Sequence, residues 1–80
     1  MTTRERSITD IAQAHIHRHK QKLACQGKMK TEQFILQNKG AIKAIYDQLR
    51  LSYNLQRNKE LDKCFKLGVE AFLQAEGLLA

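Results

Sequence analysis

The chain has 80 residues, of which 42% are hydrophobic, and its 14 Lys and Arg against 8 Asp and Glu give a formal net charge of +6. A chain of this length forms one domain and buries only about 60% of its unfolded surface, so a core shared across a dimer would help it to fold. The lack of proline and the presence of only four glycines favour helix and exclude turn-rich sandwiches and barrels. We predict a single all-α domain, residues 1–80, that forms a homo-oligomer.

The first ten residues, MTTRERSITD, are polar and contain no apolar run typical of a signal peptide. No run of 18 apolar residues occurs anywhere in the chain, so we expect no membrane-spanning helix. These features predict a cytoplasmic protein. In a reducing compartment Cys25 and Cys64 are expected to be free thiols.

The first helix is predicted over residues 7–26. Ser7 and Thr9 are good N-cap residues, and Gly27 is a natural helix end. The apolar face of this helix also includes two histidines and a lysine, and in full it holds Ile8, Ile11, Ala12, His15, Ile16, His19, Lys22 and Leu23. A face so rich in polar residues predicts a peripheral or interfacial helix.

The second helix is predicted over residues 32–55, although Asn38-Lys39-Gly40 resembles a helix end. The apolar residues keep the same helical phase on both sides of the glycine: Phe34, Ile35, Ala41, Ile42, Ile45, Leu49 and Tyr53. Because a glycine inside a helix costs only about 1 kcal/mol, we favour one continuous helix, with a break at Gly40 as the alternative. That break would allow a helix-turn-helix over residues 32–51, to which Leu36, Lys39 and Tyr46 are poorly suited.

The third helix is predicted over residues 58–79, after the N-cap residue Asn58. Its apolar face covers close to half of its circumference, so we place it at the centre of a three-helix bundle. Gly68 lies among bulky residues of that face. It either lets a neighbouring helix approach closely or is merely a tolerated small residue.

Three histidines alternate along the first helix. His15 and His19 are four residues apart and share one face, which is the spacing of helical zinc sites, whereas His17 points away. A metal would need two or three further ligands, and neither HExxH nor CxxC is present. We therefore expect packing histidines and no metal site. If the three titrate near pH 6.5, acidification would strengthen binding of an anionic partner.

Positive charge is concentrated in the N-terminal part of the chain. Residues 1–30 carry seven Lys and Arg against two acids, whereas residues 31–80 carry seven against six. Cations along a surface are what phosphate contacts require, although a solvated surface is the alternative interpretation. Aromatic residues for base stacking are few. The candidate nucleic-acid-binding residues are Arg4, Arg6, Arg18, Lys20, Lys22, Lys28 and Lys30.

Catalytic features are lacking, because the acids are scattered and no glycine-rich phosphate loop or nucleophile–base pair is visible. We expect no enzymatic activity, no catalytic residue and no cofactor. The sequence predicts a small nucleic-acid-associated accessory or regulatory protein that binds DNA or RNA phosphates through its basic N-terminal helix. The alternative is an α-helical protein-protein interaction module (an inhibitor, adaptor or chaperone) that recognises a larger, acidic partner.

Overall fold

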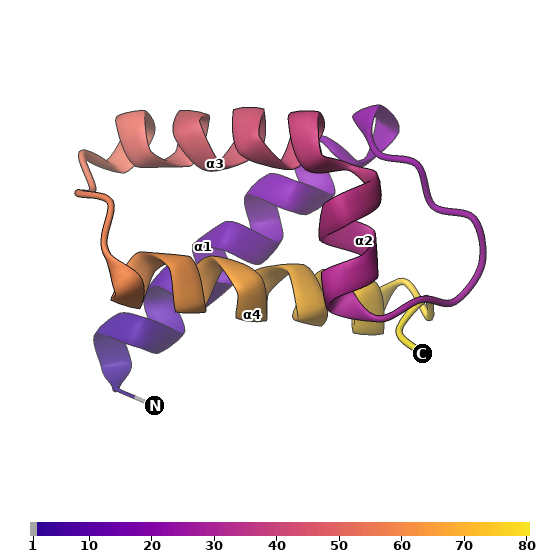
Figure 1. The fold of residues 1–80 in the computed structure, drawn as a ribbon. Helices are drawn as coiled ribbons and strands as arrows, with labels where there is room; N and C mark the ends of the chain where they lie inside the picture. Colours follow the sequence, from indigo (N-terminus) through magenta and orange to yellow (C-terminus); the bar gives the residue numbers. More distant parts are fainter. Residues whose placement is uncertain (1) are drawn as a thin grey trace.

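The computed structural model describes residues 2–80 and contains four α-helices: α1 (Thr3–Arg18), α2 (Thr31–Gln37), α3 (Lys39–Tyr53) and α4 (Lys59–Ala75) (Figure 1). A 3₁₀ turn, η1 (Lys20–Lys22), follows α1. Residues 2–80 form no strand beyond one isolated bridge between Met29 and Leu79. The predicted all-α fold is confirmed. Within this part of the chain, no helix combines the length and the apolar character needed to cross a membrane.

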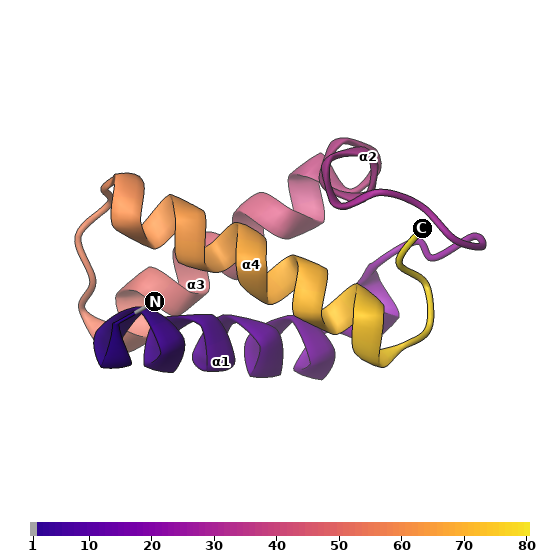
Figure 2. The same cartoon turned by 90° about the horizontal axis from the view of Figure 1, so that it is seen from below.

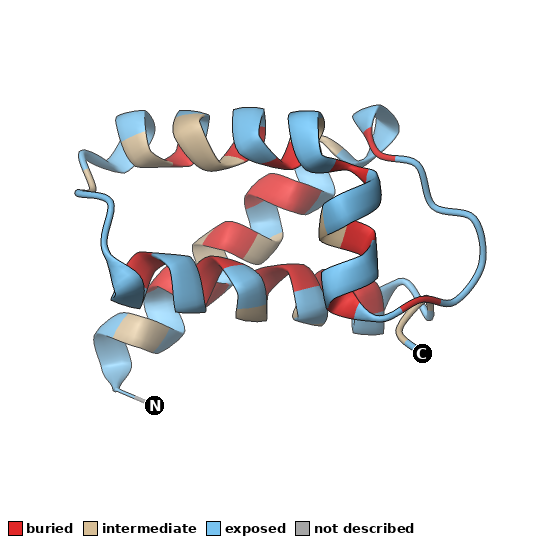
Figure 3. Ribbon diagram, viewed as in Figure 1, coloured by how far each residue is buried: buried red, intermediate tan, exposed pale blue. Residues whose placement is uncertain are grey.

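The last helix lies at the centre of the fold, as the sequence predicts. It begins after Asn58, whose side chain accepts a hydrogen bond from the Leu61 amide at 2.8 Å. α4 lies along α1 (Figure 2) and also contacts α2. Its contact with α3 includes Phe65, whose ring centroid lies 5.1 Å from that of Tyr46. Phe72 packs against Phe34 of α2 with ring centroids 6.1 Å apart. The buried apolar side chains of residues 2–80 form one cluster within a single copy (Figure 3).

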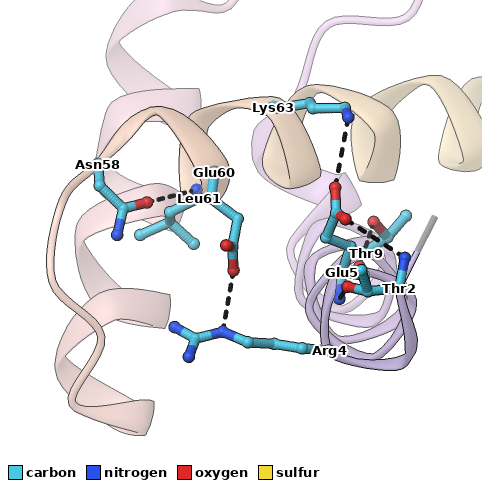
Figure 4. A network of polar contacts seen from close by, with 8 residues as sticks. All are labelled: Thr2, Arg4, Glu5, Thr9, Asn58, Glu60, Leu61 and Lys63. Carbon is cyan, nitrogen blue, oxygen red and sulfur yellow. Dashed lines mark hydrogen bonds and ion pairs between the residues drawn. The ribbon is translucent and has the colours of Figure 1, made fainter.

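The first helix begins earlier than the predicted residue 7. The Thr2 side chain accepts a hydrogen bond from the Glu5 amide, and the Glu5 carboxylate accepts one from the Thr2 amide (Figure 4). This reciprocal pair is a capping box, whose T-x-x-E pattern is present in the sequence. Lys63 of α4 contacts the same carboxylate at 3.3 Å, so the cap also ties α1 to the centre of the fold.

The predicted peripheral position of the first helix is wrong. Ala12 and Ile16 are fully buried, and α1 lies along α4. The reason is Gly68 of α4, where an added Cβ would lie 2.6 Å from the Ala12 Cβ and 3.0 Å from the Gln13 amide nitrogen. The close-approach interpretation of Gly68 is therefore confirmed. A helix with few large apolar residues becomes a core helix because its partner has no side chain at the crossing.

The first helix also ends at Arg18 rather than near residue 26. After η1 the backbone becomes extended at Leu23, whose side chain is buried. The amide and carbonyl of Ala24 then pair with the side chain of Asn38. These two attachments draw the chain away from the helix axis, and Gly27 lies in the connection that follows, with φ of 79°.

The prediction of one continuous helix over residues 32–55 is wrong, because α2 and α3 meet at Asn38 (Figure 1). This residue has φ −112° and ψ 30°, and its buried amide binds both Ala24 and the Phe34 carbonyl. Gly40 lies inside the first turn of α3 and does not make the break. A helix-turn-helix has a turn of three or four residues between its helices. Only one residue, Asn38, separates α2 from α3, so the two helices do not form this motif.

The last helix stops at Ala75 and not at residue 79. Gly77 takes φ of 71° and donates to the Gln74 carbonyl, while the Leu78 amide donates to the Leu73 carbonyl at 2.8 Å. This is a Schellman motif, which favours glycine at the left-handed position. It turns the C-terminal residues back towards the connection between η1 and α2.

Candidate polyanion-binding surface

Five of the seven candidate cations lie on one stretch, residues 18–30, which we call the basic loop. It contains no acid, and its cations are Arg18, Lys20, Lys22, Lys28 and Lys30. It comprises the end of α1, η1 and the connection to α2. Figure 1 shows this connection at the end of the molecule where α2 also lies.

The basic loop is held at two points. At the first, the Ala24 amide donates to Asn38 Oδ1 at 2.7 Å, and Asn38 Nδ2 donates to the Ala24 carbonyl at 3.2 Å. At the second, buried Met29 donates its amide to the Leu78 carbonyl at 2.9 Å and accepts from the Ala80 amide at 3.0 Å. The cations therefore project from a backbone whose position is fixed by the core.

The cations of the basic loop differ in their neighbours. Lys20 Nζ lies 3.6 Å from Glu76 Oε1. Lys30 shares a shallow hollow with Glu32 and Glu70. By contrast, Arg18, Lys22 and Lys28 are exposed, form no ion pair with any residue in 2–80 and share no hollow with an acid, whereas Lys30 is exposed and unpaired but lies near Glu32 and Glu70. These three are the most available to an external anion.

The other two candidate cations lie at the opposite end of α1. Arg4 and Arg18 are separated by 14 positions of one helix, which corresponds to about 21 Å along its axis. Arg4 Nε forms an ion pair with Glu60 Oε1 at 2.9 Å (Figure 4), and Arg6 is exposed. The seven candidate residues thus form two groups and do not share one surface.

The histidines occupy different environments. His15 is buried, with its ring 6.5 Å from that of His19 and 5.8 Å from that of Tyr53. His17 is exposed and lies 3.4 Å from Glu76. Among residues 2–80, no three His, Cys, Asp or Glu side chains gather as a metal site would require. Cys25 and Cys64 are free thiols, as predicted.

We expect His15 to make the protein less stable as pH falls below about 7. Burial, followed by the charges of Arg18 and His19, lowers the pKa of His15, and its Nδ1 has no hydrogen-bond partner in residues 2–80. The unfolded chain takes up a proton near pH 6.5, whereas the folded chain resists it until the pH passes its lower pKa. Because the unfolded state binds more protons in this window, acidification favours unfolding.

Urea unfolding between about pH 7.5 and 5.5 measures this effect, because carboxylates titrate mainly below that range. We expect the native protein to lose stability with acidification and the His15→Phe variant to lose less. The exposed His17→Gln variant is the control and should keep the native pH dependence. An unchanged slope in His15→Phe would contradict the assignment to His15.

The sequence interpretation missed four cations outside the N-terminal segment. Lys39, Lys43, Arg57 and Lys66 line one groove between α3 and α4. They lie in the part of the chain whose total charge is nearly balanced, so a count of charges does not single them out. A local pattern in the sequence indicates two of the four cations: Lys39 and Lys43 lie one helical turn apart, next to apolar Ile42.

Comparison of the chain with family models, with curated proteins and with solved structures yields no match in any of the three.

Proposed function

We propose that the protein is a small nucleic-acid-associated accessory protein that binds phosphates through its basic loop. The observation that supports this proposal is the run of five cations without an acid in residues 18–30. Arg18, Lys22 and Lys28 are exposed and unpaired within residues 2–80, so an external anion would not have to displace an internal carboxylate. Phosphate contacts position a protein but do not read bases, and we therefore expect weak sequence preference.

Fluorescence anisotropy with mixed-sequence duplex DNA and RNA tests this proposal. Three to five phosphate contacts predict that affinity falls by roughly 40-fold to 500-fold between about 50 and 200 mM salt. In the triple variant R18A/K22A/K28A we expect weaker binding and a salt slope reduced by about one per cation removed. Each of these side chains is exposed, so the substitutions should leave the fold intact.

A second triple variant, R4A/R6A/K59A, is the matched control, because it removes three positive charges from the opposite end of the molecule. It should bind almost as well as the native protein. Equal losses in the two triple variants would mean that net charge and not the basic loop determines binding. Weak binding at low salt, unchanged by either set of substitutions, would contradict the proposal as a whole.

The second candidate function is recognition of an acidic protein partner. Much of the half-polar face of the first helix is not available to a partner, because Ala12, His15 and Ile16 are buried, although Lys22 at its end is exposed. A different surface favours this function: the groove between α3 and α4, whose walls carry the four additional cations.

A further inference from the structure

A groove with a volume of about 320 Å³ is lined by residues of α3 and α4, and by Ile35 of α2. The helix α2 lies at one end of α3 and α4 (Figure 1). The floor of the groove is apolar and comes from all three helices: Ile35, Ile42 and Phe65. Ile42 and Phe65 are only 6% and 5% exposed, so they form a base that belongs to the core. Small-molecule pockets begin at about 300 Å³, and this groove reaches that volume.

Cations stand on more than one side of this apolar floor. Lys39 and Lys43 lie on α3, Lys66 lies on α4, and Arg57 lies on the connection between them. Lys39, Lys43 and Arg57 form no ion pair within residues 2–80. Lys66 Nζ lies 2.7 Å from Glu32 Oε1, and the Glu32 side chain is 63% exposed. An exposed pair of this kind contributes little and can be exchanged for an external carboxylate.

The groove contains one acid, Asp62, whose carboxylate is already hydrogen-bonded within the protein. Tyr46 Oη donates a hydrogen bond to Asp62 Oδ1 at 2.5 Å. Burial and this hydrogen bond raise the pKa of Tyr46 to about 12, so its hydroxyl remains a donor at neutral pH. With four cations against one carboxylate, the lining has a net charge of +3.

An apolar floor with cations on both sides is complementary to a ligand that has an apolar ridge and negative charges on both flanks. A fatty acid carries one carboxylate at one end, and a nucleic acid backbone has no apolar ridge. An amphipathic helix carries apolar anchors at i, i+3, i+4 and i+7 and can place acids on either side of them. The α3 wall from Lys39 to Tyr46 is about 10 Å long, which matches two turns of such a helix.

We propose that this groove docks an acidic amphipathic helix of a partner protein. Apolar anchors of the partner lie on Ile42 and Phe65, and its carboxylates pair with Lys39 and Lys43 on one wall and with Lys66 on the other. No residue of the basic loop lines the groove. The inference therefore does not depend on the proposed nucleic acid binding, and the two sites can be tested separately.

The test uses a fluorescent helical peptide of about 16 residues, or roughly four turns, with leucines at the anchor positions and glutamates on both flanks. We expect micromolar binding to the full-length protein, with amide chemical shifts that change at Ile42, Tyr46 and Phe65. Replacing either the leucines with serine or the glutamates with glutamine should weaken binding about tenfold or more. These control peptides separate the apolar contribution from the charge contribution.

The protein variants localise the site. In K39A/K43A, whose side chains are exposed, we expect an unchanged circular dichroism spectrum and about tenfold weaker peptide binding. The basic-loop variant R18A/K22A/K28A should bind the peptide normally. The proposal is overturned if the peptide does not bind, or if the serine peptide binds equally well. It is also overturned if dodecanoate or duplex DNA displaces the peptide and shifts the same groove residues.

Discussion

Replacing Gly68 with alanine is expected to lower the free energy of unfolding by about 2 kcal/mol, although alanine is the better helix former by about 1 kcal/mol. The new methyl carbon would lie 2.6 Å from the Ala12 Cβ, 3.0 Å from the Gln13 amide nitrogen and 3.1 Å from the Thr9 carbonyl oxygen. These atoms belong to the backbone of α1 or are attached directly to it, so they cannot rotate away. The two helices must separate, which loosens the packing of buried Ile16.

Thermal or urea unfolding followed by circular dichroism measures this loss, which corresponds to a decrease in Tm of about 10 °C for a domain of this size. The matched control is Gly40→Ala in α3, where an added Cβ meets no atom within 4 Å. That variant should be as stable as the native protein or more stable by up to about 1 kcal/mol. Gly68→Ala behaving like Gly40→Ala would contradict the crossing of α1 and α4 at this residue.

A double-mutant cycle assigns the loss to one contact. Ala12→Gly removes the Cβ that would clash with the new methyl group. By itself this substitution lowers the free energy of unfolding by about 1 kcal/mol, because glycine is the poorer helix former. In the combined variant, A12G/G68A, we expect the losses to be less than additive, with a coupling of about 1 kcal/mol. Strict additivity would show that the strain at Gly68 comes from a contact other than Ala12.

The sequence predicts the fold class and most of the core because both depend on local composition and periodicity. The broad face of the last helix and its Asn58 cap are visible within about six helical turns. Phe34, Ile42, Ile45 and Leu49 are all buried, as their shared phase predicts. Tyr53, at the end of the same series, is 48% exposed, because α3 ends there.

The errors in the prediction arise where residues distant in sequence meet. The burial of α1 depends on Gly68, which follows its partner Ala12 by 56 positions. The break between α2 and α3 depends on a bond from Asn38 to a residue 14 positions earlier. The groove cations likewise come from separate elements. Periodicity along one helix contains no information about any of these pairings.

Asn38 is the residue whose loss should reveal this dependence most directly. We expect Asn38→Leu to lower the free energy of unfolding by about 2 kcal/mol, because it removes three hydrogen bonds and leaves their partners without a replacement. The partners are the Ala24 amide, the Ala24 carbonyl and the Phe34 carbonyl, at 2.7, 3.2 and 3.1 Å. Leucine is also a good helix former, and it favours a continuous helix over residues 32–55, which the shared helical phase of the flanking apolar residues allows.

Amide hydrogen exchange separates the loss of this attachment from a general loss of stability. In Asn38→Leu the Ala24 amide should exchange much faster than the core amides of α4, because its acceptor has gone. Gln37→Leu, at the exposed neighbouring position, is the matched control and should leave the Ala24 amide protected. Detachment at Ala24 would also free one end of the basic loop, so Asn38→Leu should weaken nucleic acid binding although it removes no charge. Native protection of Ala24 in this variant would mean that buried Leu23, together with the hydrogen bonds of Met29, holds the loop in place without Asn38.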